Sequence, residues 1–205
     1  MQKSGKLIAG SSIVLFGGSF DPIHCGHLQI AQSVLKAFDV EQVVFIPSQQ
    51  APLKGFASVA SPEDRLKMVS LAITGENRFV LDSLEVDRGG TSYSSETIEI
   101  YRARYPQKKL YWVLGEDQFA NLQNWNAIEF IIREVEFLVY PRVSGHFSGS
   151  DMDGIRYEWL DCPRLNVSST NIRERSRTSQ SIKGLVPRSV EAFIHSRQIY
   201  QVKEN

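Results

Sequence analysis

Residues 17–27 read Gly-Gly-Ser-Phe-Asp-Pro-Ile-His-Cys-Gly-His, and they indicate the type of fold more clearly than any other segment. An apolar run at 13–16 precedes them, and a segment with helical periodicity begins at Leu28. The predicted order is strand, glycine-rich turn and helix, in which backbone N–H groups and a helix N-terminus can face an anion. His24 and His27 lie one helical turn apart and add donors on the same side. This pattern suits a chain of phosphates better than any other class of ligand.

The residue types in this turn leave some alternatives open. The two glycines permit a positive φ and a close approach of the backbone, and the serine after them can add a hydroxyl to a phosphate oxygen. Asp21 precedes a proline, and we expect it to shape the turn or cap an element rather than bind a metal. The histidines could instead be structural, or could ligate a metal with Cys25. Zinc normally takes three or four protein ligands, and only His146 and His195 remain, so metal binding is the weaker interpretation.

Composition bounds the class of protein. The 205 residues suffice for one sizeable α/β domain, and 42% of them are hydrophobic, as in folded globular chains. Lysine plus arginine equals aspartate plus glutamate at 23 each, so we expect neither nucleic acid nor an anionic membrane surface as a partner. The apolar runs are too short to span a bilayer. Two cysteines imply no disulfide framework and fit the reducing cytoplasm.

Strand and helix patterns alternate along the chain. Apolar runs predict strands at 13–16, 43–46, 79–81, 110–114, 137–140 and 157–160. Periodicity and start signals predict helices at 28–38, 61–75, 94–105, 128–133, 169–177 and 187–197, with Ser94 or Ser95 capping the third. We therefore expect a Rossmann-like α/β fold, a doubly wound, mostly parallel sheet with helices on both faces. Residues 1–11 are expected to form a flexible tail, and 12–205 a single domain on which the helical part from about 168 packs.

Ligands of such sheets bind beyond the carboxyl ends of the strands, near the point where the strand order reverses. The loops after four predicted strands, which end at Phe16, Ile46, Leu114 and Leu160, would share that edge. The candidate chemical residues lie in or near those loops. We consider this coincidence stronger evidence for a site than any single motif.

Three serine and threonine residues at 168–170, with Arg173 one turn on, offer a second anion site at a helix start. An ordinary N-cap beside a surface arginine is the alternative. Lys54 follows the second strand and could reach a phosphate, although most loop lysines are merely solvated. Asp117, just past a strand end, could accept ribose hydroxyls or cap the next helix. Trp125 and Tyr93 could line a site or pack in the core.

The first motif closely resembles the signature of the nucleotidyltransferases with a His-x-Gly-His motif, and later blocks extend the likeness to bacterial nicotinate-nucleotide adenylyltransferases. These blocks are Ser92-Tyr93-Ser94 with Glu96-Thr97, Leu114-Gly115-Glu116-Asp117 with Trp125, Val167-Ser168-Ser169-Thr170-Asn171-Ile172-Arg173, and Leu185-Val186-Pro187. They are similar to that family's Ser-Tyr-Thr segment, its Gly-x-Asp…Trp block, its Ile-Ser-Ser-Thr-x-Ile-Arg block and its closing helix. Together they span residues 13 to about 200 in the family's order.

The resemblance implies transfer of AMP from ATP to nicotinate mononucleotide, which gives deamido-NAD and pyrophosphate in NAD biosynthesis. It implies Mg²⁺ bound with ATP, and it assigns catalysis to His24 and His27. The implied ATP-binding residues are Gly17, Gly18, Ser19, Phe20, Gly115, Asp117, Ser168, Ser169, Thr170 and Arg173. The implied acceptor-binding residues are Lys54, Ser92, Tyr93, Ser94 and Trp125. Backbone N–H groups near 92–94 would favour nicotinate over nicotinamide.

The chain departs from the family at Ser94, where threonine is usual, at Asn126, where an aromatic is common, and in one loop, where Ala51-Pro52-Leu53-Lys54 replaces Pro-Pro-His-Lys. Any difference from the family is therefore expected in affinity for the second substrate. Alternatives are an adenylyl- or cytidylyltransferase of the same superfamily with another phosphate-bearing acceptor, and a nucleotide-binding module without turnover. The sequence pattern does not distinguish a monomer from a homodimer.

Overall fold

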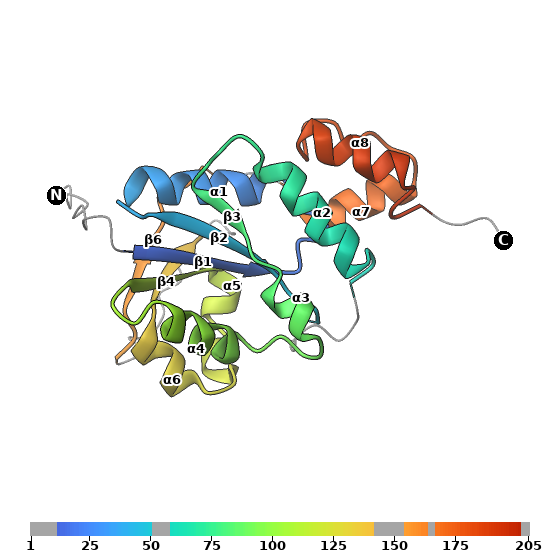
Figure 1. Cartoon of the computed structure of the whole chain (residues 1–205). Helices are drawn as coiled ribbons and strands as arrows, with labels where there is room; N and C mark the ends of the chain where they lie inside the picture. The colour runs from blue at the N-terminus through green and yellow to red at the C-terminus, as the bar shows by residue number, and fades with distance from the viewer. Residues whose placement is uncertain (1–11, 51–57, 142–153, 164–166, 202–205) are drawn as a thin grey trace.

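The computed structural model describes residues 12–50, 58–141, 154–163 and 167–201. Within these ranges, six parallel strands form one sheet in the order β3-β2-β1-β4-β5-β6 (Figure 1). The strands are β1 (Ser12–Gly18), β2 (Gln42–Pro47), β3 (Phe79–Leu81), β4 (Lys109–Gly115), β5 (Glu136–Tyr140) and β6 (Tyr157–Trp159). The helices are α1 (Cys25–Ala37), α2 (Pro62–Ile73), α3 (Leu84–Arg88), α4 (Ser94–Arg104), α5 (Glu116–Phe119), α6 (Ile128–Glu134), α7 (Ser169–Arg177) and α8 (Arg188–Ser196), with a 3₁₀ turn at Leu122–Asn124. The predicted fold class is confirmed.

Both faces of the sheet are buried, which explains the unbroken apolar runs of the central strands. Alternate residues of β1 face opposite sides. Val14 and Phe16 join a core with α1 and α2, whereas Ile13 and Leu15 join a second core with α4 and α6. Figure 1 shows α1 and α2 on one face and α4 and α6 on the other. The sheet is thus wound in both directions from β1, and the order reverses between β1 and β4.

The C-terminal helices extend the first of these cores. Ile172 of α7 and Val190 and Ile194 of α8 are buried in the same cluster as Phe16. The Ser189 hydroxyl donates to the Leu71 carbonyl, which ties α8 to α2. Figure 1 shows α7 and α8 beside α2, at the carboxyl end of β1. This packing brings the N-terminus of α7 to the edge where a ligand is expected.

Several helix starts differ from the predicted positions. Ser61 caps α2 as predicted, because its hydroxyl accepts the Asp64 N–H. α1 begins at Cys25 with His24 as the N-cap, three residues before the predicted start. The prediction that Ser94 or Ser95 caps α4 is wrong, since the chain turns into the helix one residue earlier and Tyr93 is the N-cap. α3 and α5 were not predicted, because five and four residues are too few to show a helical period.

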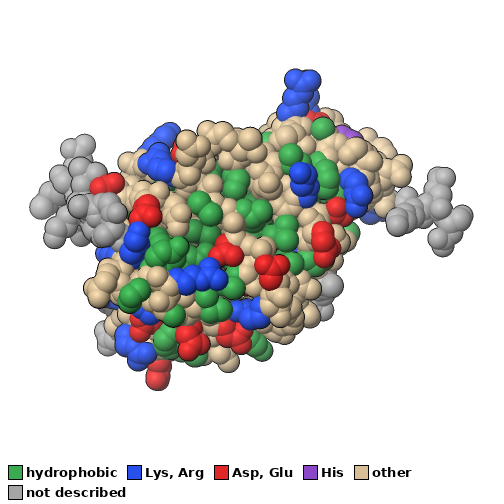
Figure 2. Space-filling model, in the orientation of Figure 1, with side chains coloured by type: hydrophobic (Ala, Val, Ile, Leu, Met, Phe, Trp, Pro, Cys, Tyr) green, Lys and Arg blue, Asp and Glu red, His purple; other side chains and the backbone are tan. Residues whose placement is uncertain are grey.

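The surface carries mixed charge. Figure 2 shows acidic and basic side chains interspersed over the visible face, without a large field of one sign. This matches the balanced composition of the chain. Among the described residues, no helix combines the length and the apolar character that a membrane crossing requires.

Candidate active site

A cleft of about 1450 Å³ opens at the carboxyl edge of the sheet. It is lined by residues at or beyond the ends of β1, β2, β4, β5 and β6, and by the first turns of α1, α4 and α7. Its volume exceeds the roughly 300–1,000 Å³ of an ordinary small-molecule pocket. The cleft therefore has room for two nucleotides, at the strand-order reversal where open α/β sheets bind ligands.

The two histidines of the first motif form a stacked pair at the start of α1. Their ring centroids lie 3.7 Å apart with planes inclined by 20°, and both rings line the cleft. The His24 backbone N–H donates to Nδ1 of His27 over 3.2 Å. Because Nδ1 accepts this bond, the neutral His27 ring carries its proton on Nε2. The edges of Phe16 and Phe20 against His27 hold the ring in place.

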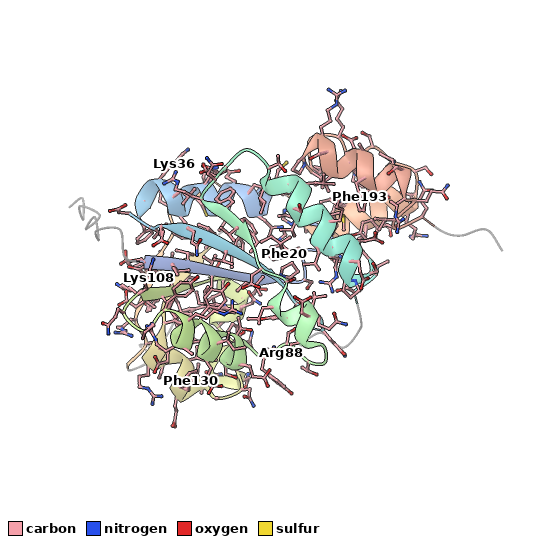
Figure 3. All side chains as sticks on the ribbon, viewed as in Figure 1. Phe20, Lys36, Arg88, Lys108, Phe130 and Phe193 are labelled. Atoms are coloured by element: carbon pink, nitrogen blue, oxygen red, sulfur yellow. The ribbon has the colours of Figure 1, made fainter. Side chains whose placement is uncertain are left out.

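The glycines before the histidines serve close packing rather than a positive φ. A Cβ on Gly17 would lie 2.8 Å from Cζ2 of the buried Trp112, and one on Gly18 would lie 3.1 Å from the Phe20 ring. Neither glycine has a positive φ, so that part of the expectation is wrong. The left-handed residue of the turn is Phe20, with φ at 47°. Its ring is buried at the carboxyl end of the sheet beneath α2 (Figure 3), and this packing holds the unusual backbone conformation.

Asp21 is the centre of a buried network that joins four segments of the chain. Its carboxylate accepts the N–H groups of Val59 and Ala60 over 2.8 and 3.1 Å, and the Tyr200 hydroxyl over 2.8 Å. Its backbone carbonyl accepts Nη1 of Arg173 over 2.8 Å. Asp21 therefore has the structural role predicted for it, and it does more than shape its own turn.

Arg65 of α2 holds the loops on either side of the cleft floor. It is fully buried, and its guanidinium donates to the carbonyls of Ser19 after β1 and of Ser48 and Gln49 after β2. Burial lowers the Arg65 pKa, and the nearby Asp21 carboxylate opposes that shift. Sequence reasoning missed this arginine, because nothing in an amphipathic helix marks one basic residue as buried.

The N-terminus of α7 faces the same cleft and is tied to the first motif. Ser168 caps the helix by accepting the Asn171 N–H, and Ser169 donates to the Pro22 carbonyl over 2.9 Å. Arg173 bridges the Asp21 carbonyl and the Thr170 hydroxyl. The N-cap interpretation and the anion-site interpretation are thus compatible, since the cap leaves these groups lining the cleft.

Ser92, Tyr93, Ser94 and Trp125 line the cleft beside α4. Ser92 accepts the Gln49 N–H over 2.9 Å, and the Trp125 ring stands edge-on to Trp112 at 6.2 Å. Among the described residues, no side chain caps the start of α4, so none of them satisfies its first N–H groups as a cap.

The remaining candidates divide into three cases. Asp117, in the first turn of α5, lines the cleft, whereas Gly115 caps that helix and is not among the lining residues. Lys54, with the whole unusual 51–54 segment, lies outside the described residues. Every other candidate in the described ranges lines the cleft. Sequence reasoning missed two further charged lining residues, Glu85 and Arg175, which stand in segments that read as ordinary surface.

Cys25 and Cys162 are free and partly buried, and burial raises the pKa of both thiols. In the described ranges, no group of three or more His, Cys, Asp or Glu side chains converges as a metal site would require.

Comparisons with known proteins agree with this geometry. A family model described as cytidylyltransferase-like matches residues 15–175. A protein of Opitutus terrae named "Probable nicotinate-nucleotide adenylyltransferase" is 34% identical over 190 residues, covering 92% of this chain and 97% of its own. One of Geobacillus kaustophilus with the same name is 37% identical over 188 residues, covering 92% and 85%. The fold resembles a solved structure of "Plasmodium falciparum nicotinic acid mononucleotide adenylyltransferase complexed with APC", with a TM-score of 0.76, 19% identity and 93% and 97% coverage.

Proposed function

This chain belongs to the nicotinate-nucleotide adenylyltransferase family, nucleotidyltransferases of NAD biosynthesis, and we propose that its cleft transfers AMP from ATP to nicotinate mononucleotide. An oxygen of the mononucleotide phosphate attacks the α-phosphorus of ATP, the bond to the β-phosphate breaks, and deamido-NAD and pyrophosphate leave. The attacking oxygen is already anionic, so no protein nucleophile is needed. The site then works by positioning the reactants and stabilising charge.

One observation carries the proposal on the ATP side: the N-termini of α1 and α7 face one cleft, and α7 is hydrogen-bonded to the turn that precedes α1. Ser169 donates to the Pro22 carbonyl and Arg173 to the Asp21 carbonyl, and these two bonds hold the start of α7 next to the first motif. Each helix start favours a negative group through its dipole and N–H groups. A triphosphate is long enough to use both.

In this proposal, His24 and His27 donate to the ATP phosphates and stabilise the charge that develops as pyrophosphate leaves. The stacked rings and the packing of His27 on Phe20 place these donors before the reaction begins. Ser168, Thr170 and Arg173 hold the outer phosphates. Asp117 accepts ribose hydroxyls of the adenosine, with Gly115 shaping the turn behind it.

The acceptor half of the cleft is assigned to the residues beside α4. Trp125 and Tyr93 would enclose the pyridine ring, and Lys54 would meet the acceptor phosphate. The uncapped N–H groups at the start of α4 would favour the carboxylate of nicotinate over the neutral amide of nicotinamide. The described residues offer no carboxylate cage, so we propose that Mg²⁺ enters as part of the ATP substrate. There it would neutralise part of the charge on the phosphates.

We place the reaction in the cytoplasm, because both cysteines are free thiols in the fold.

The proposal is tested by pyrophosphate release in four parallel reactions: ATP with nicotinate mononucleotide, ATP with nicotinamide mononucleotide, ATP with phosphopantetheine, and CTP with nicotinate mononucleotide. We expect release in the first and a much lower kcat/KM in the others. Equal kcat/KM for the two pyridine mononucleotides would remove the assigned role of α4. Faster release with phosphopantetheine or CTP would replace the proposed substrates.

A further inference from the structure

Glu85 is a buried carboxylate in the wall of the cleft that the proposed roles above leave unused. It belongs to α3, its side chain is 4% exposed, and it is among the cleft-lining residues. Burial raises the pKa of Glu85, because the charged form loses water. A carboxyl group in such a place is costly unless donors surround it.

Two hydroxyl donors satisfy Glu85, and both come from the acceptor side of the cleft. The Thr97 hydroxyl, in the first turn of α4 and fully buried, donates to Oε1 over 2.6 Å. The Ser92 hydroxyl forms the second hydrogen bond. Arg88, at the end of α3 (Figure 3), supplies a nearby positive charge and also pairs with Glu96 of α4 at 3.2 Å. Glu85 is thereby joined to Ser92, just before α4, and to Thr97 in the first turn of α4.

Ser92 extends this connection to the loop after β2. Its Oγ accepts the Gln49 N–H over 2.9 Å, and its own N–H donates to the Gln50 carbonyl over 2.9 Å. A serine hydroxyl can accept and donate at the same time, so Ser92 can accept from Gln49 while it donates to Glu85. The result is an ordered chain from the Gln49 amide through Ser92 to the carboxylate, which Thr97 completes.

We propose that Glu85 is a positioning residue for the acceptor mononucleotide, because its carboxylate holds Ser92 and Thr97 and so sets the wall formed by residues 92–94. It acts through these groups and does not touch the reacting phosphorus. This inference rests on the proposed function, in which that wall encloses the pyridine ring. A carboxylate suits the position because it has two acceptor oxygens for two donors. A glutamine offers only one, so Glu85→Gln breaks one bond while the side-chain shape is kept.

The test is steady-state kinetics of Glu85→Gln with each substrate varied in turn. We expect KM for nicotinate mononucleotide to rise about tenfold, the size of one lost hydrogen bond to a charged group, with KM for ATP unchanged. Glu99→Gln is the matched control, an exposed glutamate of α4 that does not line the cleft, and should leave both KM values unchanged. A general loss of structure would change KM for both substrates, so a rise in KM for the mononucleotide alone indicates a local effect.

A double-variant cycle then tests whether Glu85 acts through Ser92. In a Ser92→Ala background, Glu85→Gln should add little to KM for the mononucleotide, whereas independent roles would multiply the two effects. Should Glu85→Gln fail to fold, Thr97→Val removes the other donor with almost no change of shape. We expect about a threefold rise in the same KM from that smaller change.

Two results would overturn the inference: an unchanged KM for the mononucleotide in both Glu85→Gln and Thr97→Val, or an equal rise in both KM values. The wild-type enzyme decides the proposed function separately. If it does not use nicotinate mononucleotide, the proposed function fails. If it does and the variants bind the mononucleotide normally, only the role of Glu85 fails.

Discussion

Replacing Tyr200 by phenylalanine removes one buried hydroxyl from the network around Asp21. Burial, together with the Asp21 charge, raises the Tyr200 pKa, so the hydroxyl remains a protonated donor. Its bond to the carboxylate is 2.8 Å long, and hydrogen bonds to charged groups contribute about 1.5–3 kcal/mol. The same oxygen keeps the Ala60 N–H at 3.1 Å, so the carboxylate is not left without a donor. We therefore expect the free energy of unfolding to fall by an amount in the lower part of that range, about 1.5–2 kcal/mol.

The assay is thermal unfolding by calorimetry, which gives Tm, with urea unfolding followed by intrinsic fluorescence as a second measure of the free energy of unfolding. A chain of 205 residues loses about 2–4 °C in Tm per kcal/mol, so the expected loss corresponds to about 3–8 °C. Tyr157→Phe, at an exposed tyrosine of β6, is the matched control and should shift Tm by less than about 1 °C. KM for ATP should also rise, because Asp21 holds Arg173. A Tyr200→Phe variant as stable as the wild type would show that the network does not tie the C-terminal segment to the first motif.

Three further variants probe the glycine turn, the histidine pair and Glu85. Gly17→Ala should lower the free energy of unfolding by about 1–3 kcal/mol, since the new Cβ would lie 2.8 Å from the buried Trp112 ring. An unchanged Tm in calorimetry would show that the core adjusts to the added methyl group. His27→Ala should lower kcat by about 10²–10³ with an intact near-UV circular dichroism spectrum, and turnover close to wild type would remove its assigned role. Burial raises the Glu85 pKa above the 4.5 of an unperturbed glutamate, so the folded state holds more protons and the free energy of unfolding falls as pH rises through that window. Glu85→Gln has no group to titrate at this position. From about pH 4.5 upward, its free energy of unfolding, measured by urea titration, should therefore rise relative to that of the wild type. If the two free energies change in parallel with pH, Glu85 titrates normally.

The fold could be predicted because its signals are local. Each central strand is buried on both faces, so an unbroken apolar run such as 43–46 marks it without knowledge of its neighbours. The start of α2 could also be predicted, because the N-cap Ser61 and Pro62 at the first helical position are adjacent in the sequence. α3 was not predicted because five residues are too few to show a helical period. The start of α4 was misplaced because its N-cap, Tyr93, makes no side-chain capping bond that a sequence pattern could indicate.

The candidate site was predictable where a motif supplies its own donors, and not where a distant segment supplies the partner. His24 and His27 lie one turn apart in the chain and are stacked in the fold. Asp21 and Tyr200 are separated by 179 positions, and no pattern around either residue indicates the other. Glu85 has the same character, because its burial depends on how α3 packs against α4. Buried charges of this kind are decided by tertiary structure, which periodicity does not reveal.

In the proposed mechanism the acceptor phosphate attacks ATP directly, and the two histidines act only as donors. This mechanism is tested most directly by the stereochemical course of transfer from one diastereomer of α-thio-ATP to nicotinate mononucleotide, with the configuration of the product read by phosphorus NMR. A single in-line displacement predicts inversion at the α-phosphorus. Retention would require two displacements through a covalent nucleotidyl-histidine and would contradict the account.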